Sequence, residues 1–305
     1  MNLQEQLQRF ASYPNDADPA GIPNLSVGGV NAGRLPVSKE VGRTGQVFYV
    51  DPVNGSTGNT GRSPSTAFST TTQALAACTS GNGDIIYRLP GLELLTAPVV
   101  VNKTGVSIIA APYKTTFNTP TDYLYYSSTG NSTGPVFQVT HKAYLYGLAT
   151  YGIWSAGCDV QVVQSTGSDP SGSVLEKCLI YGAASNYGLS LEGVNKCSFL
   201  ECTISGTDAI LMTKAASTEV ANNLFRGCEI IGATNAVEKS TGSTGTPDGN
   251  VWEECLISGV VDNNAANLVQ YFLDCKINAT GVDGFMDVTT TGYTSTVAIG
   301  NVYTD

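Results

Sequence analysis

The segments VLEKCLIYG (174–182), SFLECTISG (198–206), LFRGCEIIG (224–232), VWEECLISG (251–259) and YFLDCKINA (271–279) share one pattern. Each has an apolar residue, two variable residues, a cysteine, one more variable residue and an isoleucine, and a glycine follows in four of the five. The cysteines follow one another at intervals of 24, 26, 27 and 20 residues. A drifting period in the twenties with one short strand per copy predicts a solenoid.

Two residue columns define the expected interior of this solenoid. The cysteine and the isoleucine two positions later share one face of a strand, and that face must point inward. Coils stacked about 4.8 Å apart would place equivalent residues over one another. A second short strand is expected after the glycine of most copies, at 187–191, 208–212, 235–239 and 283–288. The inward columns are Leu175, Phe199, Phe225, Trp252 and Phe272; Cys178, Cys202, Cys228, Cys255 and Cys275; and Ile180, Ile204, Ile230, Ile257 and Ile277.

The predicted fold class is all-β: a single-stranded right-handed parallel β-helix of about nine coils, from near residue 83 to residue 300. No helical pattern long enough for a βαβ crossover separates the copies, so turns must join the parallel strands. The period also suits leucine-rich repeats, but their Leu-x-x-Leu-x-Leu run is absent. The cysteines are interpreted as small buried hydrophobic residues. A zinc site is not expected because the chain has no CxxC motif and a single histidine, His141. No cofactor is predicted.

Composition excludes several partners. The net charge is −10, and there is no run of lysine and arginine, so nucleic acid is not expected to bind. No apolar stretch has the length of a membrane-spanning helix, and no membrane partner is predicted. The N-terminus MNLQEQLQRF has neither the basic nor the apolar region of a signal peptide. The chain is therefore expected to be made in a cytoplasm without signal-peptide export.

Residues 1–45 are expected to form an extended N-terminal arm. Four prolines and several glycines interrupt residues 13–45, and no periodicity is present. Residues 1–12 suit a short helix with Leu3, Leu7 and Phe10 on one side. A segment of this composition orders against a partner or its own domain. Two interpretations remain open: the arm lies along its own β-helix or a sister chain, or it anchors the protein to a larger assembly through Leu3, Leu7 and Phe10.

The β-helix domain is expected to span residues 46–305, with a capping segment at 46–82. Residues 47–50 suit a strand, and residues 70–78 suit a short helix that would cover the open end of the solenoid. This block resembles the entry segment of the pectin-lyase-like β-helix family. The matching residues are Tyr49-Val50-Asp51, Asn54-Gly55, Thr71 to Leu75, Gly83-Asp84 and Pro90-Gly91. With the repeats, the resemblance covers residues 46–300. The family includes polysaccharide lyases, glycosidases, bacteriophage tailspikes and other trimeric virion proteins.

The sequence offers weak candidates for catalysis. The family's lyases use calcium held by acidic residues, but no Asp-x-Asp stands in the repeats here, and the loop 51–62 lacks a closing glutamate. No metal site is predicted. Glycosidases need two carboxylates about 5 to 9 Å apart. Glu254 and Asp274, each just before a repeat cysteine, would lie on neighbouring coils at about that separation. They are the catalytic pair only in the alternative interpretation; the main one assigns no catalytic residue.

Outward positions of the same strands suggest a subunit interface. Leu179, Tyr181, Ile231 and Leu256 would form an apolar patch on the exterior. Exposed apolar patches usually have a use, and we expect these residues to form the interface of a homotrimer. A sugar-binding platform built from tyrosines such as Tyr151 is the alternative use.

The resemblance and these features together predict a non-enzymatic bacteriophage virion protein. The expectation is a tailspike-like β-helix trimer acting as a capsid decoration or cement protein, held by its arm to capsid or tail proteins of the particle. The alternative is a small tailspike or receptor-binding polysaccharide depolymerase that acts on a host glycan as a glycosidase or lyase.

Overall fold

The computed structural model describes residues 26–27, 30–31, 45–110, 125–128, 134–152, 157–182, 187–213, 220–239, 248–261, 269–278, 297–299 and 302–303. The chain divides into two compact units, Met1–Arg43 and Thr44–Asp305. In the first unit, β1 (Ser26–Val27) pairs with β2 (Val30–Asn31) in antiparallel fashion. The expected helix at 1–12 with Leu3, Leu7 and Phe10, and the expected strand at 283–288, lie outside the described residues.

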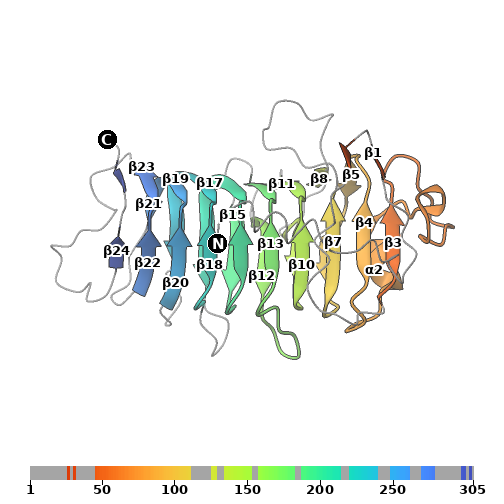
Figure 1. Ribbon diagram of the computed structural model, residues 1–305, viewed down its shortest axis with the longest axis horizontal. Coiled ribbons are helices and arrows are strands. Elements are labelled where there is room, and N and C mark those ends of the chain that lie inside the picture. Colours follow the sequence, from red (N-terminus) through yellow and green to blue (C-terminus); the bar gives the residue numbers. More distant parts are fainter. Residues whose placement is uncertain are drawn as a thin grey trace, which may run out of the picture. The chain divides into compact units, whose positions relative to one another are not determined.

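The second unit is a parallel β-helix, which confirms the predicted fold class. Its strands follow one another along the chain as neighbouring arrows, coil after coil (Figure 1). The ten-stranded sheet contains, in spatial order, β3 (Val47–Val50), β4 (Ile85–Arg88), β7 (Val106–Ala110), β10 (Ala143–Tyr146), β13 (Val174–Glu176), β16 (Ser198–Leu200), β18 (Leu224–Arg226), β20 (Asp248–Glu253), β22 (Val269–Leu273) and β24 (Val297–Ile299).

The thirteen-stranded sheet has a main path and a side branch. The main path contains β5 (Glu93–Leu95), β8 (Tyr125–Ser128), β11 (Ala149–Gly152), β14 (Leu179–Gly182), β17 (Thr203–Thr213), β19 (Glu229–Lys239), β21 (Leu256–Val261), β23 (Lys276–Asn278) and β25 (Val302–Tyr303). The side branch contains β6 (Val99–Val101), β9 (Phe137–Val139), β12 (Cys158–Val163) and β15 (Tyr187–Glu192), and it joins the main path at β17.

A corner divides each repeat segment between the two sheets. The residue just before each repeat cysteine has a positive φ: Lys177 (52°), Glu201 (51°), Gly227 (62°), Glu254 (54°) and Asp274 (51°). A single left-handed residue turns the chain from a strand of the ten-stranded sheet into a strand of the main path. The expectation of one strand per segment is therefore wrong, because each segment forms two strands with this corner between them.

The predicted interior columns are confirmed. Strand register pairs Phe199 with Phe225, and Phe225 with Trp252, in adjacent coils. Their rings stack with centroids 4.6 Å apart in the first pair and 4.0 Å apart in the second. The cysteine column and the isoleucines from position 180 to 257 are also buried. Stacked aromatic rings that bury this much area make the column a major part of the core.

Beyond the corner, two repeats differ from the expected pattern. The sequence predicts a turn at Gly206 and at Gly232, with a separate strand after each. Instead, β17 and β19 each run for 11 residues through the glycine, and the register shifts between Gly206 and Asp208. A β-carbon on Gly232 would lie 1.8 Å from the carbonyl oxygen of Asn235. The glycine is thus required by a close backbone approach within a bent strand.

The entry segment contains a short 3-10 helix η1 (Pro64–Thr66) and the expected helix, α2 (Thr71–Ala77). The Thr70 side chain accepts a hydrogen bond from the backbone N–H of Gln73, which closes a capping box. Glu93 of β5 accepts hydrogen bonds from the backbone N–H and the hydroxyl of Thr71, both at 2.9 Å, and lies 3.5 Å from the Arg88 guanidinium. Helix α2 contacts β3, β4 and β6. Its role in closing the end of the stack stays a prediction.

Candidate functional site

The carboxylates of the alternative catalytic pair belong to corner residues. Glu254 and Asp274 precede β21 and β23, which pair in register, so the two residues lie on neighbouring coils as the sequence predicts. Both are exposed, and both hold the left-handed conformation. Gly227 occupies the same column one coil earlier. Position 254 therefore has a structural role as a corner, whatever its side chain does, and catalysis by this pair stays a prediction.

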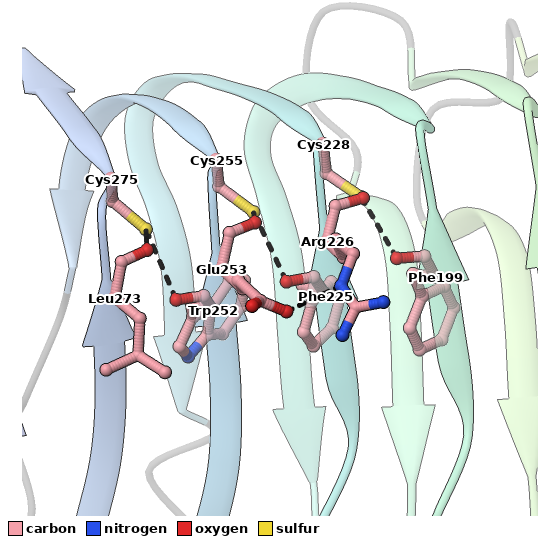
Figure 2. A network of polar contacts seen from close by, with 9 residues as sticks. All are labelled: Phe199, Phe225, Arg226, Cys228, Trp252, Glu253, Cys255, Leu273 and Cys275. Carbon is pink, nitrogen blue, oxygen red and sulfur yellow. Dashed lines mark hydrogen bonds and ion pairs between the residues drawn. The ribbon is translucent and has the colours of Figure 1, made fainter. Parts of the chain in front are cut away.

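The cysteine column satisfies backbone groups next to these corners. Three of its thiols donate to the backbone carbonyl oxygen of the aromatic residue one coil earlier: Cys228 to Phe199 at 3.3 Å, Cys255 to Phe225 at 3.4 Å and Cys275 to Trp252 at 3.3 Å (Figure 2). A cysteine is thus more than a small hydrophobic residue here, because its weak S–H donor reaches a carbonyl oxygen in the preceding coil.

The thiols of this column have the raised pKa values of buried core residues. All eight cysteines of the chain are thiols and not disulfides. Burial raises the pKa of Cys202 well above its usual range, and the Cys228 thiol is the main cause that raises the pKa of Cys255 to about 12. Metal binding and nucleophilic attack need the thiolate, which these environments disfavour.

The predicted interface residues divide into two groups. Tyr181, Ile231 and Leu256 are exposed, and the Tyr181 ring stacks on Tyr151 of the preceding coil, with centroids 5.2 Å apart. Leu179, by contrast, is buried in the hydrophobic core cluster, with 3% of its surface exposed, so its predicted place in an exposed patch is wrong. Strand alternation predicts the side on which a residue lies but not whether other parts of the chain cover that side.

The exposed apolar surface extends further than the sequence predicts. Leu94 of β5 occupies the same outward column as Tyr151, Tyr181 and Ile231, through position 127 of β8. Leu92 precedes it by two residues and is also exposed. Among the described residues, the large hydrophobic side chains that are exposed are Val53, Leu92, Leu94, Tyr181, Ile231 and Leu256. Four of these six belong to the main path of the thirteen-stranded sheet.

A polar ladder that was not predicted from the sequence lies on the side branch. The Gln138 side-chain amide donates to Gln161 at 2.7 Å, and the Gln161 amide donates to a Glu192 carboxylate oxygen at 3.2 Å. Burial raises the pKa of Glu192 despite this hydrogen bond. The signal was the repeated triplets Phe137-Gln138-Val139 and Val160-Gln161-Val162, which alternate inward and outward residues. Such a ladder offers donors and acceptors to a polar ligand.

An asparagine ladder, also missed, is structural. Asn223, just before β18, and Asn250, within β20, are fully buried. The side-chain oxygen Oδ1 of Asn250 accepts from the Asn223 backbone N–H at 3.0 Å, and Oδ1 of Asn223 accepts from the Cys197 backbone N–H at 2.9 Å. These hydrogen bonds connect adjacent coils of the β-helix.

One carboxyl group lies inside the β-helix. Asp159 of β12 is 1% exposed, and one of its oxygens accepts a hydrogen bond from the Thr150 hydroxyl of β11. Its other oxygen, Oδ1, has no hydrogen-bond partner. Burial raises the pKa of Asp159 well above its usual range, because desolvation of the carboxylate outweighs the hydrogen bonds from the Thr150 side chain and the Tyr181 backbone.

The remaining sequence candidates have local structural partners. Asp51 accepts hydrogen bonds from the backbone N–H groups of Val53 and Asn54, both at 2.9 Å, which makes a turn of the loop 51–62. The His141 ring contacts the Thr140 hydroxyl at 3.0 Å. Within the described ranges, no three His, Cys, Asp or Glu side chains converge as metal ligands. In the same part of the chain, no helix is long and apolar enough to cross a membrane.

Comparisons with known proteins identify the architecture. No family model matches the chain, and no curated protein matches it. Among solved structures, ORF18 of Geobacillus virus E2 aligns at a TM-score of 0.51 and 16% identity over 69% of this chain, which spans 46% of the length of that protein. The pectate lyase Pel9A aligns at a TM-score of 0.50 and 14% identity over 85% of this chain and 74% of its own. The likeness identifies the fold as a right-handed parallel β-helix.

Proposed function

We propose that this chain is a non-enzymatic structural component of a bacteriophage particle, most concretely a capsid decoration or cement protein held by its N-terminal arm. The observation that carries this proposal is the concentration of exposed apolar side chains on one sheet face, at Leu94, Tyr181, Ile231 and Leu256. Such a surface suits association with protein. The likeness to a viral open reading frame supports the phage setting.

The homotrimer expected from the sequence is one way to cover this face. The arm, residues 1–45, precedes β3, the first strand of the β-helix. We therefore assign the attachment to capsid or tail proteins to the arm, with Leu3, Leu7 and Phe10 as its apolar anchors.

A small tailspike that degrades a host polysaccharide is the second candidate. The pectate lyase likeness favours it, and so does the ladder of Gln138, Gln161 and Glu192, because hydroxyl-rich ligands pair with amide and carboxylate groups. In this candidate, Glu254 and Asp274 remain a possible catalytic pair at the exposed corner, alongside Glu192 with its raised pKa.

Deleting residues 1–45 tests the main proposal. Particles of the phage that lack this protein are incubated with full-length or shortened chain, and occupancy is measured by quantitative mass spectrometry. The shortened chain should keep the thermal unfolding curve of the β-helix and lose at least about 90% of the occupancy, as loss of a few apolar anchors at a contact implies. Full occupancy by the shortened chain would refute the anchor.

The double variant Glu254→Gln with Asp274→Asn is the matched control. It changes exposed carboxylates without moving the corner, so occupancy and unfolding should match the parent chain. If the parent clears a host capsule polysaccharide and the double variant does not, the depolymerase replaces the structural protein as the function.

A further inference from the structure

Strand β5 has one edge with no strand beside it. Strands β4, β5 and β6 follow one another along the chain and form one coil. Beyond β4 lies β3, and helix α2 contacts β6. Strand β5, in contrast, ends the main path: it pairs with β8, and the described part of the chain provides no backbone hydrogen bond to its other edge. This second edge is the open edge of β5.

Exposure along β5 shows which backbone groups lie at the open edge. Glu93 and Leu95 are almost fully buried, with 4% and 6% of their surface exposed. Leu92 and Leu94 are 44% and 59% exposed. In a strand, residues whose side chains share a face also direct their N–H and C=O groups to the same edge. The two buried residues therefore suit the ladder to β8, and the N–H and C=O groups of Leu94 point to the open edge.

The side chains at the open edge are apolar. Leu94 is more exposed than Ile231 (39%), which lies in the same outward column but has a strand on both sides. Val53 is 70% exposed and lies beside the start of β5, because a β-carbon on Gly91 would lie 2.8 Å from its Cγ2 atom. Val53 and Leu92 thus extend the apolar surface next to the open edge.

The open edge lacks the features by which natural edge strands avoid pairing, which are charged side chains and prolines. Glu93 is the one charged residue in the segment 89–102, and no proline stands within 91–97. The Glu93 carboxylate is turned away from solvent, because it lies 3.5 Å from the Arg88 guanidinium and accepts a hydrogen bond from the Thr71 N–H. Another strand would therefore meet neither a charge nor a missing N–H group at this edge.

From this edge we propose that β5 accepts one extended strand of another protein, a strand that is uncharged and has apolar side chains at alternate positions. A row of backbone N–H and C=O groups recognises another backbone, so the ligand is a polypeptide strand. The proposal rests on the proposed function for the source of this strand, which is a capsid or tail protein of the particle.

The alternative occupants suit the open edge less well. Two copies of this chain repel one another, because each carries a net charge of −10. Because β3 and α2 lie beyond the neighbouring strands of the coil, a single strand reaches β5 more readily than the end of a second β-helix does. The chain's own residues Met1–Arg43 form a compact unit of their own, in which β1 pairs with β2.

Hydrogen exchange in the free chain is the first test. The Leu94 amide should exchange at least about tenfold faster than the amide of Ser205, which has a strand on both sides, and it should do so at every protein concentration. Mass spectrometry with fragmentation to single residues measures both rates. Slow exchange at Leu94 in the free chain would mean that this chain or a second copy already occupies the open edge, and would overturn the proposal.

Exchange on the particle is the second test. Binding should slow exchange of the Leu94 amide at least about tenfold. Leu94→Lys places a charge on the open edge and should restore the fast rate at position 94. Ile231→Lys is the matched control, because it places the same charge in the same outward column within the sheet, and it should keep the Leu94 amide protected.

The outcomes separate this contact from the proposed function. A chain that occupies the particle while its Leu94 amide exchanges as in the free chain would overturn the contact at the open edge and leave the proposed function standing. Loss of protection in Ile231→Lys but not in Leu94→Lys would place the contact on the sheet face and would also overturn it. A chain that never occupies the particle would refute the proposed function, and the contact at the open edge with it.

Discussion

Replacing Trp252 with alanine is expected to lower the free energy of unfolding by about 3–5 kcal/mol, which is the usual cost of emptying a large aromatic site in a core. Trp252 is fully buried, and its ring stacks 4.0 Å from the Phe225 centroid on one side and 5.8 Å from the Phe272 centroid on the other. The substitution therefore removes a link in the column that connects three coils. Chemical denaturation monitored by circular dichroism gives the change directly.

Trp252→Phe is the matched control for this site. A phenylalanine restores the ring that the neighbouring coils use at the same position, at Phe225 and Phe272. It should cost less than about 1.5 kcal/mol, because near-conservative apolar exchanges are tolerated well. A loss below about 1 kcal/mol for Trp252→Ala would show that the aromatic column contributes little to stability.

Replacing Asp159 with asparagine is expected to raise stability at neutral and alkaline pH and to change it little in acid. The pKa of Asp159 in the folded chain is raised well above that in the unfolded chain, because burial disfavours its charge. Its neutral form therefore supports the fold fully below the unfolded pKa, near 3.9, and this contribution is lost as the pH rises through the folded pKa. Asparagine keeps the shape and the hydrogen bond to Thr150 but cannot ionise. The gain at alkaline pH should be at least about 2 kcal/mol, the scale of an uncompensated buried polar or charged group.

Melting temperatures of parent and variant between pH 4 and pH 9 measure this effect. Their difference should grow with pH and then become constant. The adjacent Cys158 does not ionise in this pH range, because burial raises its pKa to about 12. Thr150→Val serves as a control, since it removes the hydrogen bond but leaves the acid and should destabilise the chain already in acid. Parallel pH curves for parent and Asp159→Asn would mean that the buried carboxyl does not titrate in the fold.

Most of the fold could be predicted from the repeat, because successive coils place the same residue types at the same interior positions. A cysteine or isoleucine in register with four others fixes both the period and the inward face, so these columns can be read from the sequence. The corner at Lys177, Glu201, Gly227, Glu254 and Asp274 could not, because its residues share a backbone conformation and not a side chain. Gly227 was the available signal, since glycine adopts positive φ at low cost.

The candidate surfaces were harder to predict, for a physical reason. Alternation along a strand fixes which side a residue faces, and it placed Tyr181, Ile231 and Leu256 correctly on exposed positions. Alternation does not show whether other parts of the chain cover that side, and Leu179, which was predicted to be exposed, is buried for this reason. The Asp159–Thr150 contact joins the side branch to the main path of the thirteen-stranded sheet at a site outside the repeats, and no sequence period marks it. The exposure and the contacts of these residues depend on segments distant in the sequence, and they were therefore harder to predict than the core columns.

The number of copies of this chain in a purified particle tests the structural role most directly. Quantitative mass spectrometry of the particle, calibrated against its major capsid protein, gives the number. A decoration or cement protein covers the shell, so the account predicts hundreds of copies per particle. A few copies to a few dozen would place the chain on spikes, and its absence from the particle would contradict the structural role altogether.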